Sequence, residues 1–150
     1  MKFNYLIPLL MLVSCKNHEN KQIITPSPLV VVIKYISAEN CSDTIEAKKY
    51  IDIEKTFHSY IDSQNVNAHA VWINQMFFFN NLGNDKKYTN NFKFHNYEFL
   101  QEIKDKKAKI TFAAKKQKAK IKSIQYTLEF TKEGIWIINN IALKKTKAVF

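Results

Sequence analysis

The sequence predicts an α+β domain in which a long N-terminal amphipathic helix and shorter helices pack on a bent antiparallel sheet. In the first half of the chain, apolar residues recur at intervals of three and four, as on one face of a helix. In the last third they alternate with polar residues, as in half-buried strands. The 150 residues are 46% hydrophobic and 24% charged, which is typical of a globular chain that buries one core. We therefore expect a single domain over residues 29–150.

The first 15 residues are typical of an export signal. The apolar stretch from Tyr5 to Val13 is too short to span a bilayer, which takes about 20 apolar residues. Its end, Leu12-Val-Ser-Cys15, resembles the lipobox of bacterial lipoproteins. The resemblance implies cleavage between Ser14 and Cys15, loss of residues 1–14 and attachment of acyl chains to the Cys15 sulfur. The alternative is an ordinary signal peptide followed by an incidental cysteine.

An acyl anchor on Cys15 implies a protein of the bacterial cell envelope, held on the inner or outer membrane with its domain in the periplasm or at the cell surface. Residues 15–28 are polar and include Pro26 and Pro28, so we expect an extended tether between lipid and domain. With Cys15 acylated, Cys41 has no disulfide partner within the chain. We expect Cys41 to be a small semi-buried residue or a free thiol.

The domain opens with two contrasting patterns. Leu29–Ile36 is a β-branched apolar run, which predicts a strand. Asp43 followed three residues later by Glu46 resembles a capping box and predicts the start of a helix over 43–63. This helix carries an apolar stripe that we expect to pack on the sheet. The stripe consists of Tyr50, Ile53, Phe57, Tyr60 and Ile61.

The middle of the chain is harder to assign. Ala68–Asn80 is apolar nearly all round and favours a buried second helix, although 71–79 also fits a strand. Residues 81–87 are typical of a loop. Asn96 can cap a short helix over 97–104.

The last third predicts strands. Residues 107–113 alternate in polarity, and a second strand follows a break at 115–117. The apolar parity of that second strand changes near Lys122 and Ser123, which predicts a β-bulge there. Thr131–Gly134 is typical of a hairpin loop with positive φ at the glycine. Ile135–Leu143 is apolar on both faces, so we expect a strand flanked by neighbours and covered by a helix.

The segment from Ile124 to Ile141, with Gly134-Ile-Trp136-Ile-Ile138 at its turn, resembles the terminal hairpin of NTF2-like, cystatin-like α+β domains. The resemblance extends over about residues 43–143 and implies a cone-shaped fold that serves enzymes and non-enzymes. In the enzymes of this family an acid, a base or a histidine lies inside the cone. The corresponding pocket would lie between the 43–63 helix and the sheet. Its candidate lining residues are His58, Asp62, Trp72 and Trp136.

Specific chemistry has little support in the sequence. His58 and Asp62 could form an acid-base dyad at i and i+4, but a surface pair on a helix is the commoner outcome. The chain has only two glycines, Gly83 and Gly134, which are too few and too far apart to form a glycine-rich phosphate loop. The four histidines lack metal-ligand spacing. We therefore predict no catalytic residue, metal or cofactor, and favour a non-enzymatic role over an enzymatic one.

The chain is basic, with a net charge of +10, and all 23 of its basic side chains are lysines. Because arginine supplies the bidentate contacts of sequence-specific recognition, nucleic acid is a disfavoured partner. Nine of the lysines lie within 104–122, next to a single acid, Asp105. Strand alternation places five of them on polar faces, where they could form one positive surface. These are Lys107, Lys109, Lys118, Lys120 and Lys122.

Three functions remain open. The favoured one is a membrane-anchored, non-enzymatic binding module whose lysine-rich sheet contacts an acidic protein or anionic lipid. A plain solvated strand face, whose lysines discourage aggregation, is the structural alternative for those lysines. The second function is a small-molecule-binding or enzymatic NTF2-like pocket. The third is an immunity protein that neutralises an acidic toxin domain.

Overall fold

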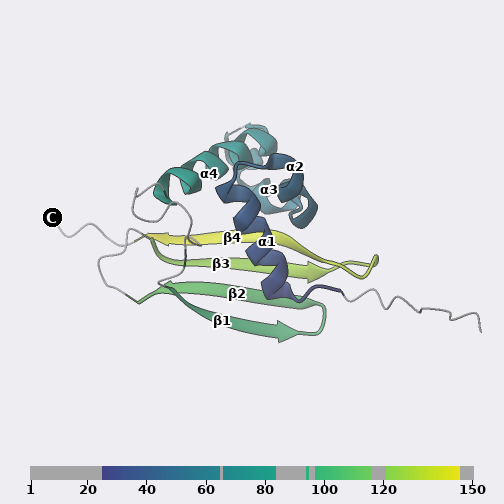
Figure 1. Ribbon diagram of the computed structural model, residues 1–150. Helices are drawn as coiled ribbons and strands as arrows, with labels where there is room; N and C mark the ends of the chain where they lie inside the picture. The colour runs from purple at the N-terminus through teal and green to yellow at the C-terminus, as the bar shows by residue number, and fades with distance from the viewer. Residues whose placement is uncertain (1–24, 65, 84–93, 95–96, 116–120, 146–150) are drawn as a thin grey trace, which may run out of the picture.

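The computed structural model describes residues 25–64, 66–83, 94, 97–115 and 121–145. Within these residues the protein is α+β, with the helices gathered on one side of an antiparallel sheet whose strand order is β1-β2-β3-β4 (Figure 1). This architecture confirms the predicted α+β class with helices packed on an antiparallel sheet. The elements are α1 (Pro28–Asn40), α2 (Thr44–Ala47), the 3₁₀ turn η1 (Lys48–Tyr50), α3 (Ile53–Gln64), α4 (Ala68–Gly83), β1 (Tyr97–Lys104), β2 (Lys107–Ala114), β3 (Ile121–Phe130) and β4 (Trp136–Lys145).

Helix α1 lies where the sequence predicted a strand, so the prediction for 29–36 is wrong. Ser27 caps the helix by accepting a hydrogen bond from the Val30 amide, and Pro28 occupies the first turn, where its missing N–H costs nothing. The buried positions recur at helical spacing along one face. They include Val31, Val32, Tyr35, Ile36 and Glu39. Burial of this face against the sheet overrides the strand propensity of the valines and isoleucines.

The single helix predicted over 43–63 is divided into α2, η1 and α3. Asp43 does cap its start, accepting from the Glu46 amide at 2.9 Å. The break comes at Ile51, whose backbone is extended and forms a parallel bridge with Ile138 of β4. The Asp52 amide then donates to the Ile138 carbonyl at 2.8 Å, and the Asp52 carboxylate accepts from the amide of Lys55. Asp52 therefore caps the start of α3. The sequence pattern does not reveal this start, because the apolar stripe continues through it.

Helix α4 confirms the second predicted helix and excludes the strand alternative for 71–79, while the predicted loop over 81–87 begins later, because residues 81–83 are still helical. The remainder of that loop, 84–87, lies outside the described residues, as does Asn96. Residues 97–104 are not a helix but strand β1, paired with β2 along its whole length. The spacing of Phe99, Leu100 and Ile103 fits a helix as well as a strand, and the hairpin with β2 decides between them.

The strands of the last third follow the predicted alternation. Ala108, Ile110 and Phe112 of β2 are all buried on the helix side. Pairing of β3 with β4 shifts between Ile121 and Ser123, which leaves Lys122 as the extra residue of the predicted bulge. The predicted hairpin loop is also confirmed, because Gly134 has a φ of +80° and the Thr131 amide donates to the Ile135 carbonyl.

Strand β4 is at the edge of the sheet, so the prediction that 135–143 is flanked by neighbours is wrong. Its covering by helices is confirmed, since α1 and α3 pack on it. The apolar character of this strand reflects that cover together with the short bridge from Ile51. The core lies between the helices and the inner face of the sheet. Its largest fully buried apolar side chains are those of Trp72, Tyr35, Tyr126, Phe57, Ile36, Ile110, Ile124, Leu128, Ile138 and Val32.

Candidate functional site

The residues proposed for a pocket are dispersed. Trp72 is 1% exposed in the core, and its indole N–H donates to the Tyr35 hydroxyl at 3.2 Å. His58 is exposed on α3, and Asp62 lies further along the same helix. Trp136 is half-buried at the start of β4, with its ring 5.0 Å from that of Phe130. The structure therefore does not bring Trp72, His58 and Trp136 together around one cavity.

Trp72 instead contacts a buried polar cluster through Tyr35. Tyr35, Glu39 and Tyr126 are each 0% exposed. Burial raises the pKa of the Tyr35 and Tyr126 phenols, and the neighbouring Glu39 carboxylate raises both further. Both phenols are therefore neutral within the core, and the Tyr35 hydroxyl accepts the hydrogen bond from Trp72. Because the cluster is closed to solvent, it is a structural feature and not a place where a ligand binds.

The structure brings together only some of the lysines of the predicted positive surface. Lys107, Lys109 and Lys122 are exposed on the open face of the sheet, the face opposite the helices, while Lys118 and Lys120 lie outside the described residues. Lys109 is paired with Thr127, whereas Lys122 follows Ile121 at the other end of β3. Five residue steps separate these two positions along the strand, which is roughly 17 Å at about 3.4 Å per residue. Lys122 is therefore remote from the other two.

A tighter group of lysines lies at the turn between β1 and β2. We call Lys104, Lys106, Lys107 and Lys109 the hairpin lysines. They line a concavity of about 660 Å³ together with Glu102, Asp105 and Thr127. Cross-strand pairing of Glu102 with Lys109, and of Lys109 with Thr127, places this concavity on the open face. Four lysines against two acids make it positive.

Sequence reasoning missed Lys104 and Lys106 as members of this group because 97–104 was assigned to a helix. The usable signal was Lys104-Asp-Lys-Lys107, in which an aspartate stands in a two-residue connection between alternating segments. Asp105 adopts a positive φ of 54°, which closes the turn.

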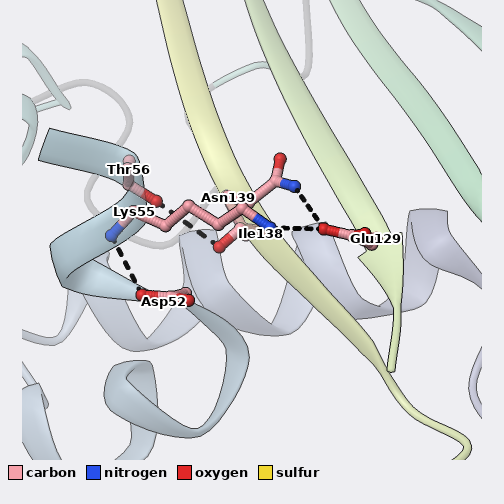
Figure 2. Close-up of polar contacts among 6 residues, drawn as sticks. All are labelled: Asp52, Lys55, Thr56, Glu129, Ile138 and Asn139. Atoms are coloured by element: carbon pink, nitrogen blue, oxygen red, sulfur yellow. Dashed lines mark hydrogen bonds and ion pairs between the residues drawn. The ribbon is translucent and has the colours of Figure 1, made fainter. Parts of the chain in front are cut away.

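Glu129, an acid near the hairpin lysines, already forms an ion pair with Lys55. Figure 2 shows Lys55 of α3 extending across β4 to Glu129, with a distance of 2.5 Å between the ammonium and carboxylate groups. Asn139 donates to the same carboxylate at 3.2 Å. The hydrogen bond from Lys55 holds the pKa of Glu129 below its ordinary value and raises the pKa of Lys55. Glu129, which pairs with Lys107 across β2 and β3, therefore shares its charge with another lysine.

The chain enters the domain at the same end of the sheet. The Thr25 hydroxyl donates to the Gly134 carbonyl at 3.1 Å, which fixes the start of the domain against the loop between β3 and β4. The Phe130 amide donates to the Lys106 carbonyl at 2.8 Å, so that loop lies beside the turn of the hairpin lysines. In Figure 1 the first described residues lead away from this end.

A second concavity, of about 390 Å³, lies between α1 and the α2–η1 segment and includes the exposed thiol of Cys41. On its wall, the hydrogen bond to Glu46 raises the pKa of Tyr50 to about 12.

The described residues contain no cluster of three or more histidine, cysteine or acidic side chains suited to a metal ion. Nor does any helix in the described parts of the chain combine the length and apolarity needed to cross a membrane.

In comparisons with known proteins, no family model, no curated protein and no solved structure matches this chain.

Proposed function

We propose that this protein is a lipid-anchored, non-enzymatic binding module of the bacterial cell envelope, and that its hairpin lysines contact anionic lipid head groups. We further propose that its domain is NTF2-like, or cystatin-like. The order of the elements supports the fold proposal, because helices precede an antiparallel meander that ends in the β3–β4 hairpin.

The observation that carries the functional proposal is the shared position of the chain entry and the hairpin lysines. Cys15, the proposed acylation site, is ten residues before Thr25. An extended segment of that length spans at most about 35 Å, so the lysines can reach the lipid surface that holds the anchor. Each lysine adds about 1 kcal/mol near an anionic membrane, and this attraction decays over about 8 Å at physiological salt. A tether that keeps the domain close makes this short-range attraction effective.

Lipid head groups suit these residues better than an acidic protein does. Lysine is a flexible point charge, whereas the planar fork of arginine matches carboxylates in fixed geometry. A chain without arginine is therefore better fitted to a fluid layer of many phosphates than to one defined acidic site. The small-molecule pocket and the immunity function stay predictions.

The test is vesicle binding by the mature chain, residues 15–150, carrying Cys15→Ser, which lacks both the apolar leader and the acylation site and so isolates the head-group contact. We expect this chain to bind vesicles containing phosphatidylglycerol and not vesicles of pure phosphatidylcholine. Replacing all four hairpin lysines with glutamine should lower the partition coefficient by up to about 1,000-fold at low salt, since up to about 4 kcal/mol of attraction is removed. The difference should shrink as salt is added.

A matched variant separates position from net charge. Lys34→Gln, Lys48→Gln, Lys122→Gln and Lys144→Gln together remove the same charge from exposed positions elsewhere. This control should retain most of the binding. Equal losses in the two variants would contradict a local contact, and equal binding to neutral and anionic vesicles would contradict head-group recognition. Capture of an acidic protein through the hairpin lysines, without vesicle binding, would assign these residues to a protein contact instead.

A further inference from the structure

Strand β1 ends the sheet and exposes its outer edge. Seven of its eight residues are exposed, and no strand in the described part of the chain pairs with that edge. Its exposed residues include large apolar ones, with Phe99 58%, Leu100 60% and Ile103 51% exposed. Natural proteins usually blunt such edges, because free backbone groups and apolar side chains promote pairing with another strand.

Backbone geometry defines which residues of β1 can pair outward. Lys104 and Lys107 flank a two-residue turn, and in such hairpins the flanking residues exchange both backbone hydrogen bonds. The pattern alternates from there along an antiparallel pair. Phe99, Gln101 and Ile103 therefore direct their N–H and C=O groups to the open edge, while the residues between them bond to β2.

We propose that β1 pairs with β1 of a second copy of this chain, antiparallel about a two-fold axis at Gln101. In this register Phe99 faces Ile103 of the second copy on the helix side of the sheet. Glu98 faces Lys104 of the second copy on the open face. Each contact occurs twice by symmetry, so the edge is complementary to itself in charge and in apolar character.

The two registers centred on the neighbouring residues lose this complementarity. A shift that centres the axis on Leu100 places Glu98 opposite Glu102, and one that centres it on Glu102 places that carboxylate opposite its own copy. Like charges facing each other across strands are destabilising. If the two-fold axis passed between two residues, a residue whose backbone groups face the second copy would lie opposite one whose backbone groups bond to β2. The hydrogen bonds between the copies could then not form. The pairing about Gln101 keeps both the hydrogen bonds and the charges matched.

The dimer would contain one continuous sheet, with four strands from each copy. A two-fold axis perpendicular to the sheet keeps both open faces on the same side. Lys106, Lys107 and Lys109 of both copies would then face one surface together. The dimer does not depend on the lipid contact, because its contacts are those of β1 alone.

The test is analytical ultracentrifugation of the mature chain, residues 15–150, carrying Cys15→Ser, over a wide range of concentration. We expect a dimer in equilibrium with monomer. Glu98→Lys and Lys104→Glu should each weaken the dimer by about tenfold or more, since each places like charges together at two symmetric positions. The double variant Glu98→Lys with Lys104→Glu restores opposite charges and should recover the original affinity. Lys122→Glu, on β3 away from this edge, is the control and should have no effect.

Cross-linking tests the register independently. With Cys15→Ser and Cys41→Ser as background, Gln101→Cys should form an intermolecular disulfide on mild oxidation, because residues directly opposite have Cα atoms about 5.5 Å apart. Leu100→Cys should not, because its two copies are diagonal neighbours about 7–8 Å apart. A monomer at all concentrations, a dimer that ignores the charge exchange, or a disulfide from Leu100→Cys alone would each overturn the proposal. None of these results depends on vesicle binding.

Discussion

At the scale of single residues, the interior contains two tyrosines with different hydrogen bonding. The Tyr35 hydroxyl accepts from the buried Trp72 indole at 3.2 Å. Tyr126 is fully buried with its ring edge-on to the rings of Tyr35 and Phe112, and its hydroxyl has no hydrogen-bond partner among the described residues. A buried polar group that lacks a partner costs stability, whereas a paired one contributes modestly.

This difference predicts opposite outcomes for two identical substitutions. Tyr35→Phe should lower the free energy of unfolding by about 1–3 kcal/mol, because it leaves the indole N–H of Trp72 buried without an acceptor. Tyr126→Phe should leave stability unchanged or raise it slightly, because the lost hydroxyl makes no described bond. Urea unfolding followed by tryptophan fluorescence measures both. A larger loss in Tyr126→Phe than in Tyr35→Phe would contradict the assigned roles.

At the scale of elements, backbone hydrogen bonds explain where helices and strands end. The Ile138 carbonyl lies on the outer edge of β4 and accepts from the Asp52 amide and the Thr56 hydroxyl, as Figure 2 shows for Thr56. This contact converts a helical stripe into two helices joined by an extended residue. Just before β4 begins, at the same end of the strand, the loop from Thr131 to Gly134 closes the hairpin with a positive φ that glycine adopts without cost.

Substitution of Gly134 should reveal this requirement. A Cβ atom at Gly134 would meet no atom within 4 Å, so conformational strain alone decides the effect. Gly134→Ala should destabilise the protein by about 1–2 kcal/mol, the usual cost of left-handed backbone for a residue with a side chain. Gly134→Asn is the control and should cost less, because asparagine tolerates that conformation. Thermal unfolding measures both, and equal costs would argue against strain as the cause.

At the scale of the whole molecule, helices cover one face of the sheet and leave the other open (Figure 1). The chain entry and the turn that carries the hairpin lysines lie at one end of the sheet. Such an arrangement is suited to a tethered protein that meets a surface with its open face. The proposed anchor controls this behaviour, because several acyl chains on one cysteine hold far more strongly than surface charge does.

Cys15→Ser should therefore move the protein from the membrane fraction to the soluble fraction of bacterial cells that express the unaltered leader. Cys41→Ser is the matched control and should remain with the membrane. Retention at the membrane, after a high-salt wash, of Cys15→Ser protein that has lost residues 1–14 would contradict an acyl anchor at this position.

Much of the C-terminal half was predictable from the sequence, because a strand pattern of period two is local. The faces of β2, the bulge at Lys122 and the turn at Gly134 could all be identified in this way. Predictions failed where two periodicities fit equally, as in 97–104, or where burial overrode propensity, as in α1. The lysine cluster was found only in part, since its membership depends on which strands pair.

The sequence by itself determined the α+β class, the end of the chain that carries the positive charge and the positions where glycine or a capping aspartate is required. These properties depend on composition and on neighbours a few residues apart. The tertiary structure alone decided that Ile51 would leave its helix to pair with Ile138, that β4 would lie at an edge, and that Lys104 and Lys106 would join Lys107 and Lys109 beside the chain entry. Each of these depends on contacts between residues far apart in the chain. The free energy of such contacts cannot be read from a pattern of neighbouring residues.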